Sequence, residues 1–430
     1  MKKNRLSLRK IILLALFLRF FLLFTPPHVD VKNHLDWGVR FWQYGPKNFY
    51  EQIFWSVSWP NQPLGSILLF ALMAKLARIL FQFLWRLNLR FAAFPSFLFP
   101  FLEKNLHLIL LKVPFVLADL GLGVLVYQIV KELTRKTKPA LLASSLFLFN
   151  PALVYNSTVW GQTDSLINFL ALLGLWLIWK NKFLGGVFFY LLSLYFKLSL
   201  IIFVPLVILL FWQKRAAWFK LLWSSVVVIS FFLLISLPFV HHGNVLTWLW
   251  YLYTNRILPR QGEMLSGNAF NLWTLLYGVD FSLKEGMIIR GVRAKLWGRI
   301  LFLLPAILAA VVLVFKKKEL KFPDYLWLGV VNAFSAFLFL TNMHERYLYP
   351  VFPLLAVLAV QKRGLVKILA ALSLIHLANL YHLWWYPRWE IIVSLFRGGE
   401  AFLPRFLSLV NFGLFLLIFK WFLADEKKSL

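Results

Sequence analysis

The stretch Ile11–Phe24, IILLALFLRFFLLF, runs directly into Thr25–Trp37, TPPHVDVKNHLDW. The first part is an apolar run of nearly the length that a helix needs to cross about 30 Å of hydrocarbon. The second part brings the first two carboxylates of the chain, Asp30 and Asp36. No A-x-A-like cleavage site follows the apolar run, so we expect a retained first helix and not a cleaved signal peptide. The two stretches together predict a membrane protein whose acidic groups begin where the chain leaves the bilayer.

Composition extends this interpretation to the whole chain. Of its 430 residues, 61% are hydrophobic and 15% are charged, and the mean hydropathy is +0.73. A water-soluble core does not hide so much apolar surface, so we predict an all-α integral membrane protein with one polytopic domain over residues 1–430. The net charge of +29 comes from short basic clusters between apolar runs, which indicates membrane topology and no nucleic-acid partner. Because the chain has no cysteine, disulfides and thiol chemistry are excluded.

The basic clusters predict the orientation, since Lys and Arg collect in cytoplasmic loops. Clusters at the N-terminus (Lys2, Lys3, Arg5, Arg9 and Lys10), at Arg86 and Arg90, and at 131–138, 180–182, 214–215, 316–321 and 362–363 alternate with outer turns. They predict about 12 to 14 crossings, with both termini cytoplasmic. The expected crossings are 11–24, 62–84, 91–102, 106–130, 139–156, 164–179, 183–195, 198–212, 218–240, 298–315, 323–341 and three more after residue 346. The run 91–102 is short and could be re-entrant, but a crossing there lets the next run end in the cytoplasm.

This topology places four polar segments on one side of the membrane. They are two long segments, 26–60 and 241–297, and two turns, 160–165 and 342–346. We expect short amphipathic helices in both long segments. Because the four segments share the non-cytoplasmic side, they are predicted to build a single site.

Asp30 is the leading candidate for a catalytic base. His34 lies four residues later and shares its helical face, so it could orient the carboxylate, whereas Asp36 points elsewhere. The alternative is that Asp30 only caps a short surface helix, which Trp37 and Phe41 indicate.

Charged residues also occur inside apolar runs. Lys112 and Asp119 lie seven residues apart and therefore on one helical face. Each charge at membrane depth costs about 2.5 to 3.5 kcal/mol on insertion scales, so both are expected to face the interior and pair. A structural ion-pair network is weighed slightly ahead of direct chemistry. Lys197, near an outer helix end, could support the site or simply extend its ammonium to the interface.

The two outer turns carry further candidates. Gln162 and Asp164 lie at a helix start, where contact with a sugar hydroxyl and simple capping are both open. In His344-Glu345-Arg346, the arginine suits bidentate phosphate binding and the histidine adds a donor, although a solvated helix end has the same composition.

Basic residues on the outer side depart from the expected charge bias. Arg256, Arg260 and Lys295 all fall in the long segment 241–297, which indicates an anionic partner there. His241-His242 could ligate a metal, but no carboxylate at a matching spacing accompanies the pair.

Several of these stretches, in order, resemble the GT-C superfamily of membrane glycosyltransferases. Within it the chain is most similar to the dolichyl-phosphate-glucose-dependent glucosyltransferases of N-glycan assembly and their shorter prokaryotic relatives. The matching stretches are Asp30 with Trp37 and Trp59–Pro63, Asp119, Pro151–Asp164, Phe196-Lys197 before Pro205, Arg256–Trp273 with Asn268–Trp273 (NAFNLW), and His344–Arg346 before Pro353.

The resemblance implies an inverting transfer of a hexose, glucose or mannose, from a polyprenyl-phosphate donor to a lipid-linked or surface glycan acceptor. Asp30 would be the base. Donor phosphate would be bound by Arg256, Arg260, His344 and Arg346. Substrate-binding or supporting roles would fall to His34, Asp36, Lys112, Asp119, Gln162, Asp164, Lys197, Asn271 and Glu345. The donor lipid stays in the bilayer, so the site should open sideways beside aromatic residues such as Trp248, Trp250, Tyr251 and Tyr253.

Departures from the family pattern limit what the resemblance implies. The first outer loop has no Asp-x-Asp pair, which puts a metal in doubt, and we expect no other cofactor. The His-Glu-Lys of the glucosyltransferases is His-Glu-Arg here, which keeps the charge but alters the geometry. The sequence around Asp30 also differs from the family pattern, so the sugar is not carried over.

Two other functions are compatible with the composition. A transporter or flippase should carry paired ionisable groups at mid-membrane and often an internal repeat, and no convincing repeat is seen. A polymerase or ligase of surface glycans would differ only in its donor. The compact loops favour a prokaryotic plasma membrane over the endoplasmic reticulum.

Overall fold

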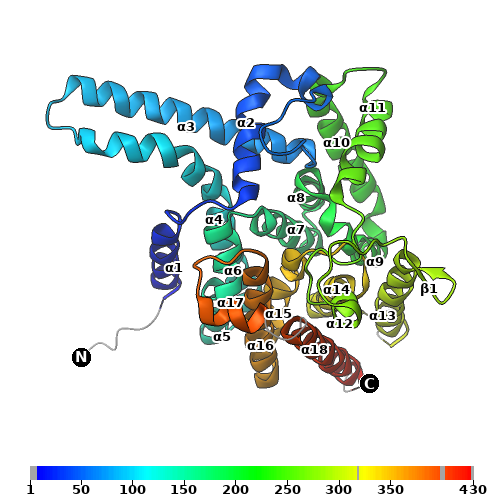
Figure 1. The fold of residues 1–430 in the computed structure, drawn as a ribbon. Helices are drawn as coiled ribbons and strands as arrows, with labels where there is room; N and C mark the ends of the chain where they lie inside the picture. Colours follow the sequence, from blue (N-terminus) through cyan, green and yellow to red (C-terminus); the bar gives the residue numbers. More distant parts are fainter. Residues whose placement is uncertain (1–6, 317–318, 398–401, 428–430) are drawn as a thin grey trace.

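The computed structural model describes residues 7–316, 319–397 and 402–427 and is almost entirely helical (Figure 1). Five of the basic residues used for orientation, Lys2, Lys3, Arg5, Lys317 and Lys318, lie outside the described residues. The helices are α1 Leu8–Leu22, α2 Val29–Asn48, α3 Leu64–Arg90, α4 Phe99–Thr134, α5 Thr137–Leu148, α6 Pro151–Val154, α7 Asp164–Trp179, α8 Phe183–Phe196, α9 Val204–Gln213, α10 Trp218–Ser236, α11 Val245–Tyr251, α12 Leu272–Tyr277, α13 Ala294–Lys316, α14 Phe322–Phe339, α15 Val351–Ala359, α16 Arg363–Leu383, α17 Glu390–Arg397 and α18 Phe402–Lys427. Strands β1 Ile288–Ile289 and β2 Val292–Arg293 form one small antiparallel hairpin.

The helices confirm a multi-pass membrane protein. Across the described ranges, seven helices are long and apolar enough to cross a membrane, and an eighth is formed if the bent pair Thr137–Leu148 and Pro151–Trp160 counts as one span. That pair is bent by 48°, and the shorter apolar helices Asp164–Trp179, Phe183–Phe196 and Leu198–Gln213 follow it. The expected 12 to 14 crossings therefore include helices that are shorter than a regular span or are broken by a bend.

Burial separates central from peripheral helices. Nearly every residue of α14 and all of α15 are buried, so both helices are surrounded by protein. In contrast, α10, α13 and α18 leave rows of large apolar side chains exposed, among them Trp223, Leu304 and Leu409. Apolar faces of this extent fit lipid and not water.

The outer side, meaning the side predicted to face away from the cytoplasm, carries the expected short helices. In the first outer loop, α2 buries Val31, His34, Trp37 and Phe41 on one face. Helices α11 and α12 lie in the segment 241–297. Helices therefore lie in both predicted outer loops, and α2 has its buried side chains along one face.

One expected crossing is wrong. Residues 91–95 form a turn, and Ser96–Thr134 continues as a single 39-residue helical stretch, so 91–102 is no separate span. A run of 12 apolar residues has the same hydropathy whether it crosses alone or extends a longer helix, which is why composition misplaced it. In Figure 1, α3 and the first part of α4 project away from the other helices as a two-helix arm.

A buried network around Asp119 joins four distant parts of the chain. Its carboxylate pairs with Arg19 of α1, whose Nη2 lies 3.1 Å from Oδ2, and accepts a 2.6 Å hydrogen bond from the Tyr349 hydroxyl. Ser157, in the π-helical turn Tyr155–Trp160, donates to the same carboxylate. The expected Lys112–Asp119 pair is wrong, because Lys112 Nζ instead donates to the Thr25 and Val159 carbonyls at 3.2 and 3.1 Å.

The ion pair gives a first prediction. Arg19→Leu leaves Asp119 buried without its cation and should lower the free energy of unfolding by about 3 to 5 kcal/mol. The double variant Arg19→Leu/Asp119→Leu should recover most of that loss, because neither charge remains. Denaturant unfolding in detergent, followed by tryptophan fluorescence, measures both. Lys180→Gln, which breaks the exposed pair with Glu132 and a 5.6 Å cation–π contact with Trp176, is the control and should cost less than about 1 kcal/mol. Equal losses in the single and double variants would contradict the assignment.

Candidate functional site

A polar cavity of about 560 Å³ opens on the outer side. We call it the polar chamber. Its walls come from α2, from the turn before α7, from the segment after α11 and from the turn before α15. The ionisable and amide side chains that line it are His28, Asp30, Asn33, His34, Asn61, Gln62, Gln162, Arg260, Gln261, His344 and Arg346. Residues from all four predicted outer segments therefore do meet.

Asp30 lies at the start of α2 and faces the chamber. Gln162 Nε2 donates to its Oδ2, the His28 Nδ1 lies 3.5 Å from the same oxygen, and Arg346 Nη1 lies 3.9 Å away. Burial opposes ionisation, but the charge of Arg346 helps to hold the pKa of Asp30 well below its ordinary value. The capping role belongs to His28, whose Nδ1 accepts from the Asp30 amide at 3.1 Å. The Asp30 carboxylate is therefore not used as the helix cap and faces the chamber.

Arg346 is shared among three carboxylates. Its Nη1 lies 2.8 Å from Glu345, and its Nε lies 4.0 Å from Asp164. That Nε and one oxygen each of Glu345 and Asp164 have no hydrogen-bond partner. Asp164 is held on its other side by Lys197 at 2.8 Å and does not cap α7 through its side chain. The cluster is thus nearly neutral and incompletely bonded, which leaves it able to accept a polar ligand.

The turn before α15 carries two groups with displaced pKa values. Burial, together with the charge of Arg346, lowers the pKa of His344 to about 3, so its imidazole is neutral at pH 7. Burial raises the pKa of Glu345 to about 7, although Arg346 opposes the shift. His34 behaves like His344: burial lowers its pKa to about 3, its ring stacks on Phe70 at 4.1 Å, and it makes no hydrogen bond to Asp30.

Arg260 differs from the other cations of the site. Its guanidinium lies 4.1 Å from the centre of the Trp59 ring and donates to the Arg256 carbonyl at 3.1 Å. Of the arginines lining the chamber, all of which are described, it is the one without a carboxylate partner. It therefore keeps its charge available to an anion.

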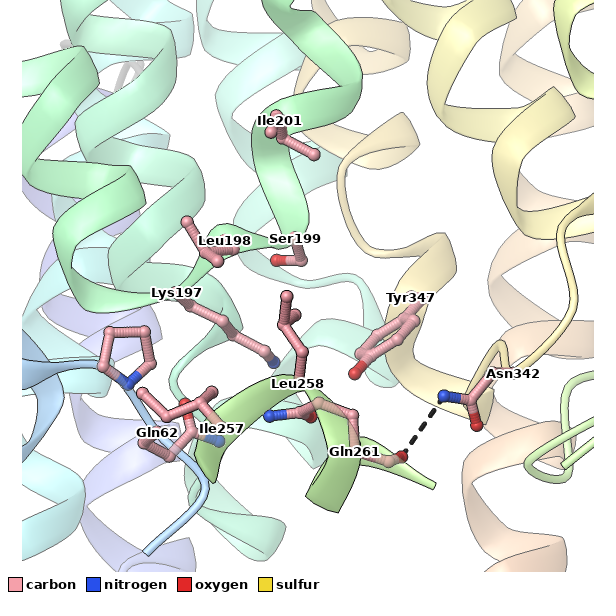
Figure 2. Close-up of a pocket in the computed structure, with 11 residues that line it drawn as sticks. Gln62, Lys197, Leu198, Ser199, Ile201, Ile257, Leu258, Gln261, Asn342 and Tyr347 are labelled. Atoms are coloured by element: carbon pink, nitrogen blue, oxygen red, sulfur yellow. Dashed lines mark hydrogen bonds between the residues drawn. The ribbon is translucent and has the colours of Figure 1, made fainter. Parts of the chain in front are cut away.

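Beside the chamber lies a second cavity of about 380 Å³, shown in Figure 2, which we call the side pocket. It shares Gln62, Gln261 and Tyr347 with the chamber. Lys197 points into it from one wall, and Asn342 Nδ2 donates to the Gln261 carbonyl at 3.3 Å across from it. The remaining walls are mainly apolar and are formed by Leu198, Ile201, Ile257 and Leu258. A polar space and a mainly apolar space thus meet at Gln62, Gln261 and Tyr347, and Lys197 lies on the apolar side of this junction.

Eight predicted residues do not line the chamber. Asp164, Lys197 and Glu345 lie in the ion-pair cluster around Arg346, and Asp119 lies in its buried network. The other four lie farther away. Asp36 binds Arg40 at 2.7 Å and the Ser56 amide at 2.9 Å, which ties α2 to its own loop. Arg256 pairs with Glu51 at 3.1 Å. Asn271 caps α12 by accepting from the Trp273 and Thr274 amides. Lys112 joins α4 to the outer ends of α1 and the π-helical turn. Each of the four has a structural role in these contacts.

Sequence reasoning missed several residues of the site and its support. His28 and Gln261 line the chamber, and Tyr347 is shared by both cavities, yet none has a pattern that distinguishes it in sequence. Arg19 did carry a signal, since an arginine inside an apolar run is expected to pair within the protein. Of the predicted interface aromatics, Trp250 and Tyr251 are exposed, whereas Trp248 is buried.

Among the described residues no group of three or more His, Asp or Glu side chains is arranged to hold a metal ion. No protein-family model matches the chain, and the search of curated proteins returned no match.

The close contact between Gly267 and His344 gives a prediction on stability. A Cβ there would lie 2.9 Å from His344 Nδ1, although the backbone conformation itself is open to any residue. Gly267→Ala should therefore displace the imidazole and lower the free energy of unfolding by about 1 to 3 kcal/mol. Gly286→Ala, in the same outer segment with open space around it, is the matched control and should change stability by less than about 0.5 kcal/mol. Thermal unfolding in detergent measures both, and equal effects would contradict the close contact.

Proposed function

We propose that this protein is an inverting, GT-C-type glycosyltransferase that moves a hexose, glucose or mannose, from a polyprenyl-phosphate donor to a lipid-linked or surface glycan acceptor at the outer face of the membrane. The observation that carries the proposal is the junction of the polar chamber, with Asp30 in its wall, and the apolar side pocket. A sugar needs the first environment and an isoprenoid chain the second. The cations near the junction, Lys197, Arg260 and Arg346, suit a phosphate between them.

In the proposed reaction an acceptor hydroxyl attacks the anomeric carbon from the face opposite the lipid phosphate. The new glycosidic bond forms as the bond from that carbon to the phosphate oxygen breaks. Asp30 takes the hydroxyl proton, and polyprenyl phosphate leaves as an anion. Arg260 and Arg346 would stabilise the charge on that leaving group.

Arg346 couples donor binding to the strength of the base. Its charge is one reason that the pKa of Asp30 is low, because the two groups lie 3.9 Å apart. A donor phosphate that draws the guanidinium toward itself weakens this interaction, so the pKa of Asp30 rises toward its ordinary value. The base would thus become a better proton acceptor only when a donor is present.

The assay for the proposal uses purified protein in nanodiscs with polyprenyl-phosphate glucose or mannose and a pool of lipid-linked acceptors. Asp30→Asn should bind donor but lose transfer by about a hundredfold or more, the scale of a lost general base. Mass spectrometry of released polyprenyl phosphate and glycosylated product gives the readout. Asp280→Asn, at an exposed outer carboxylate that accepts hydrogen bonds from the amide and hydroxyl of Ser282, is the control and should keep full activity.

Three outcomes would count against this assignment. Near-full activity of Asp30→Asn would show that Asp30 is not the base. Donor lipid that moves between leaflets without a covalent product would favour a transporter. Transfer from a glycan-carrying lipid but not from a monosaccharide-phosphate lipid would favour a polymerase or ligase.

Glu345 gives a prediction on pH. Its pKa of about 7 means that the carboxyl is mostly neutral below that pH and ionised above it. Once ionised, it competes with the donor phosphate for Arg346, so kcat/KM for donor should fall as the pH rises through about 7. Asp30, with its lowered pKa, stays ionised throughout. The pH profile of kcat/KM measures this, and Glu345→Gln should lack the decline. A decline that persists unchanged in Glu345→Gln would assign it to another group.

A further inference from the structure

The two-helix arm of Figure 1 packs mainly against itself over residues 78–105. Phe99 holds its two helices together, with its ring centre 5.8 Å from that of Phe81 and 4.9 Å from that of Trp85. The earlier part of α3 is different, since Phe70, Ala71 and the residues around them are buried against α2 and α8. From Arg78 onward most side chains of the arm are exposed. The arm is therefore anchored at its base and uncovered along its length.

Contacts at both roots place the arm at the outer side. Ser66 Oγ, in the first turn of α3, donates to the carbonyl of Phe196 at 2.6 Å, and Phe196 ends α8 on that side. In α4, Lys112 binds the Thr25 carbonyl just beyond α1. The Phe101 ring of the same helix lies 6.0 Å from the ring of Phe24.

The α4 contacts also set the direction of the arm. Phe101 and Lys112 lie about 16 Å apart along an α-helix, yet they touch adjacent residues at the end of α1. A helix that continued along the axis of α1 would carry Phe101 far beyond Phe24. The first part of α4 instead passes across the end of α1, and α4 contains Pro114, a residue type that bends helices. The arm thus runs sideways at the level where the bilayer ends.

The composition of the arm is that of an interfacial helix pair. In α3, Lys75, Arg78, Arg86 and Arg90 follow helical spacing and form one basic stripe. Glu103 is the one acidic residue between positions 64 and 111. Ile79 and Leu89 are exposed apolar residues at the same helical positions as this stripe. Further large apolar side chains are exposed elsewhere on the arm, namely Leu80, Phe83, Trp85, Phe91, Phe97, Leu98 and Phe101. A stripe of cations beside a broad apolar surface matches headgroups and acyl chains at one interface.

We propose that this arm does not cross the membrane but lies in the outer leaflet, where its apolar side chains enter the acyl region and the basic stripe binds anionic lipid headgroups. A crossing α3 would instead carry Arg86 and Arg90 to the cytoplasmic side. With the arm in the plane, the second part of α4 still ends at Lys131 and Arg135 in the cytoplasm. Removing the two expected crossings at 62–84 and 91–102 therefore keeps both termini and the later basic clusters on the cytoplasmic side. Arg86 and Arg90 then join Arg256 and Arg260 as cations on the outer side, where anionic headgroups would compensate their charge.

The first test determines the side on which the tip of the arm lies. Because the chain has no cysteine, single-cysteine variants report one position each. Ala92→Cys and Ala93→Cys, at the exposed tip, should react with a membrane-impermeant maleimide from the same side as Asp280→Cys in the long outer segment. Lys182→Cys, in the turn between α7 and α8, marks the opposite side. Labelling of the tip from the side of Lys182→Cys would show that α3 crosses, and the proposal would be wrong.

The second test distinguishes lipid from water or protein around the arm. A spin label at Phe97→Cys, a position 80% exposed, should collide with oxygen and be shielded from a water-soluble nickel chelate in nanodiscs. Ready access of the chelate would indicate water, and protection from both reagents would indicate a protein partner. Either result overturns the proposal.

The third test concerns the headgroups. Replacing phosphatidylcholine by phosphatidylglycerol in the nanodiscs should reduce the mobility of the label at Phe97→Cys. The response should be lost when Arg86→Gln and Arg90→Gln are added, and retained with Arg293→Gln in the exposed β-hairpin. A response that does not depend on Arg86 and Arg90 would refute headgroup binding by the stripe.

Discussion

The buried carboxylate of Asp119 is the constraint on which the rest of the structure depends. No water reaches it, so its charge must be compensated by protein groups, and these come from α1, the π-helical turn and the start of α15. Two of those partners are close in sequence to residues that line the chamber. Ser157 precedes Gln162 by five positions, and Tyr349 follows Arg346 by three. The Asp119 carboxylate therefore anchors, through these two hydrogen bonds, the segments that carry Gln162 and Arg346.

In and beside the chamber, the positive charges are largely compensated by carboxylates. Arg346 and Lys197 are already paired with carboxylates, and His344 is neutral because it is buried. An arriving anion must compete with Asp30, Asp164 and Glu345 for these cations, whereas Arg260 is available without competition. Ligand binding at such a site can change the pKa values of the carboxylates, because the nearby guanidinium affects the proton affinity of each one.

Hydropathy and charge bias predicted much of the fold because both are properties of contiguous sequence. The bounds of α7 agree with the expected 164–179, and those of α8 and α10 agree to within a few residues. The error at 91–102 arises because hydropathy does not distinguish three structures: apolar residues have the same hydropathy in a turn, in an extended helix and in a short crossing. Of the site, Asp30, Gln162, His344 and Arg346 were expected together because their segments share one side of the membrane.

What the sequence by itself determined is the class of the protein, the position of most helices and the common side of the polar segments. These follow from local composition, because a bilayer selects for apolar length and the cytoplasmic face for positive charge. Only the tertiary structure decided the partners. Asp119 pairs with Arg19, a hundred positions away, and not with Lys112 on its own helix. Arg256 lies outside the chamber and binds Glu51, whereas Arg260 lines the chamber and packs on Trp59. Partner choice depends on which helix faces meet, and that is set by packing between segments far apart in the chain.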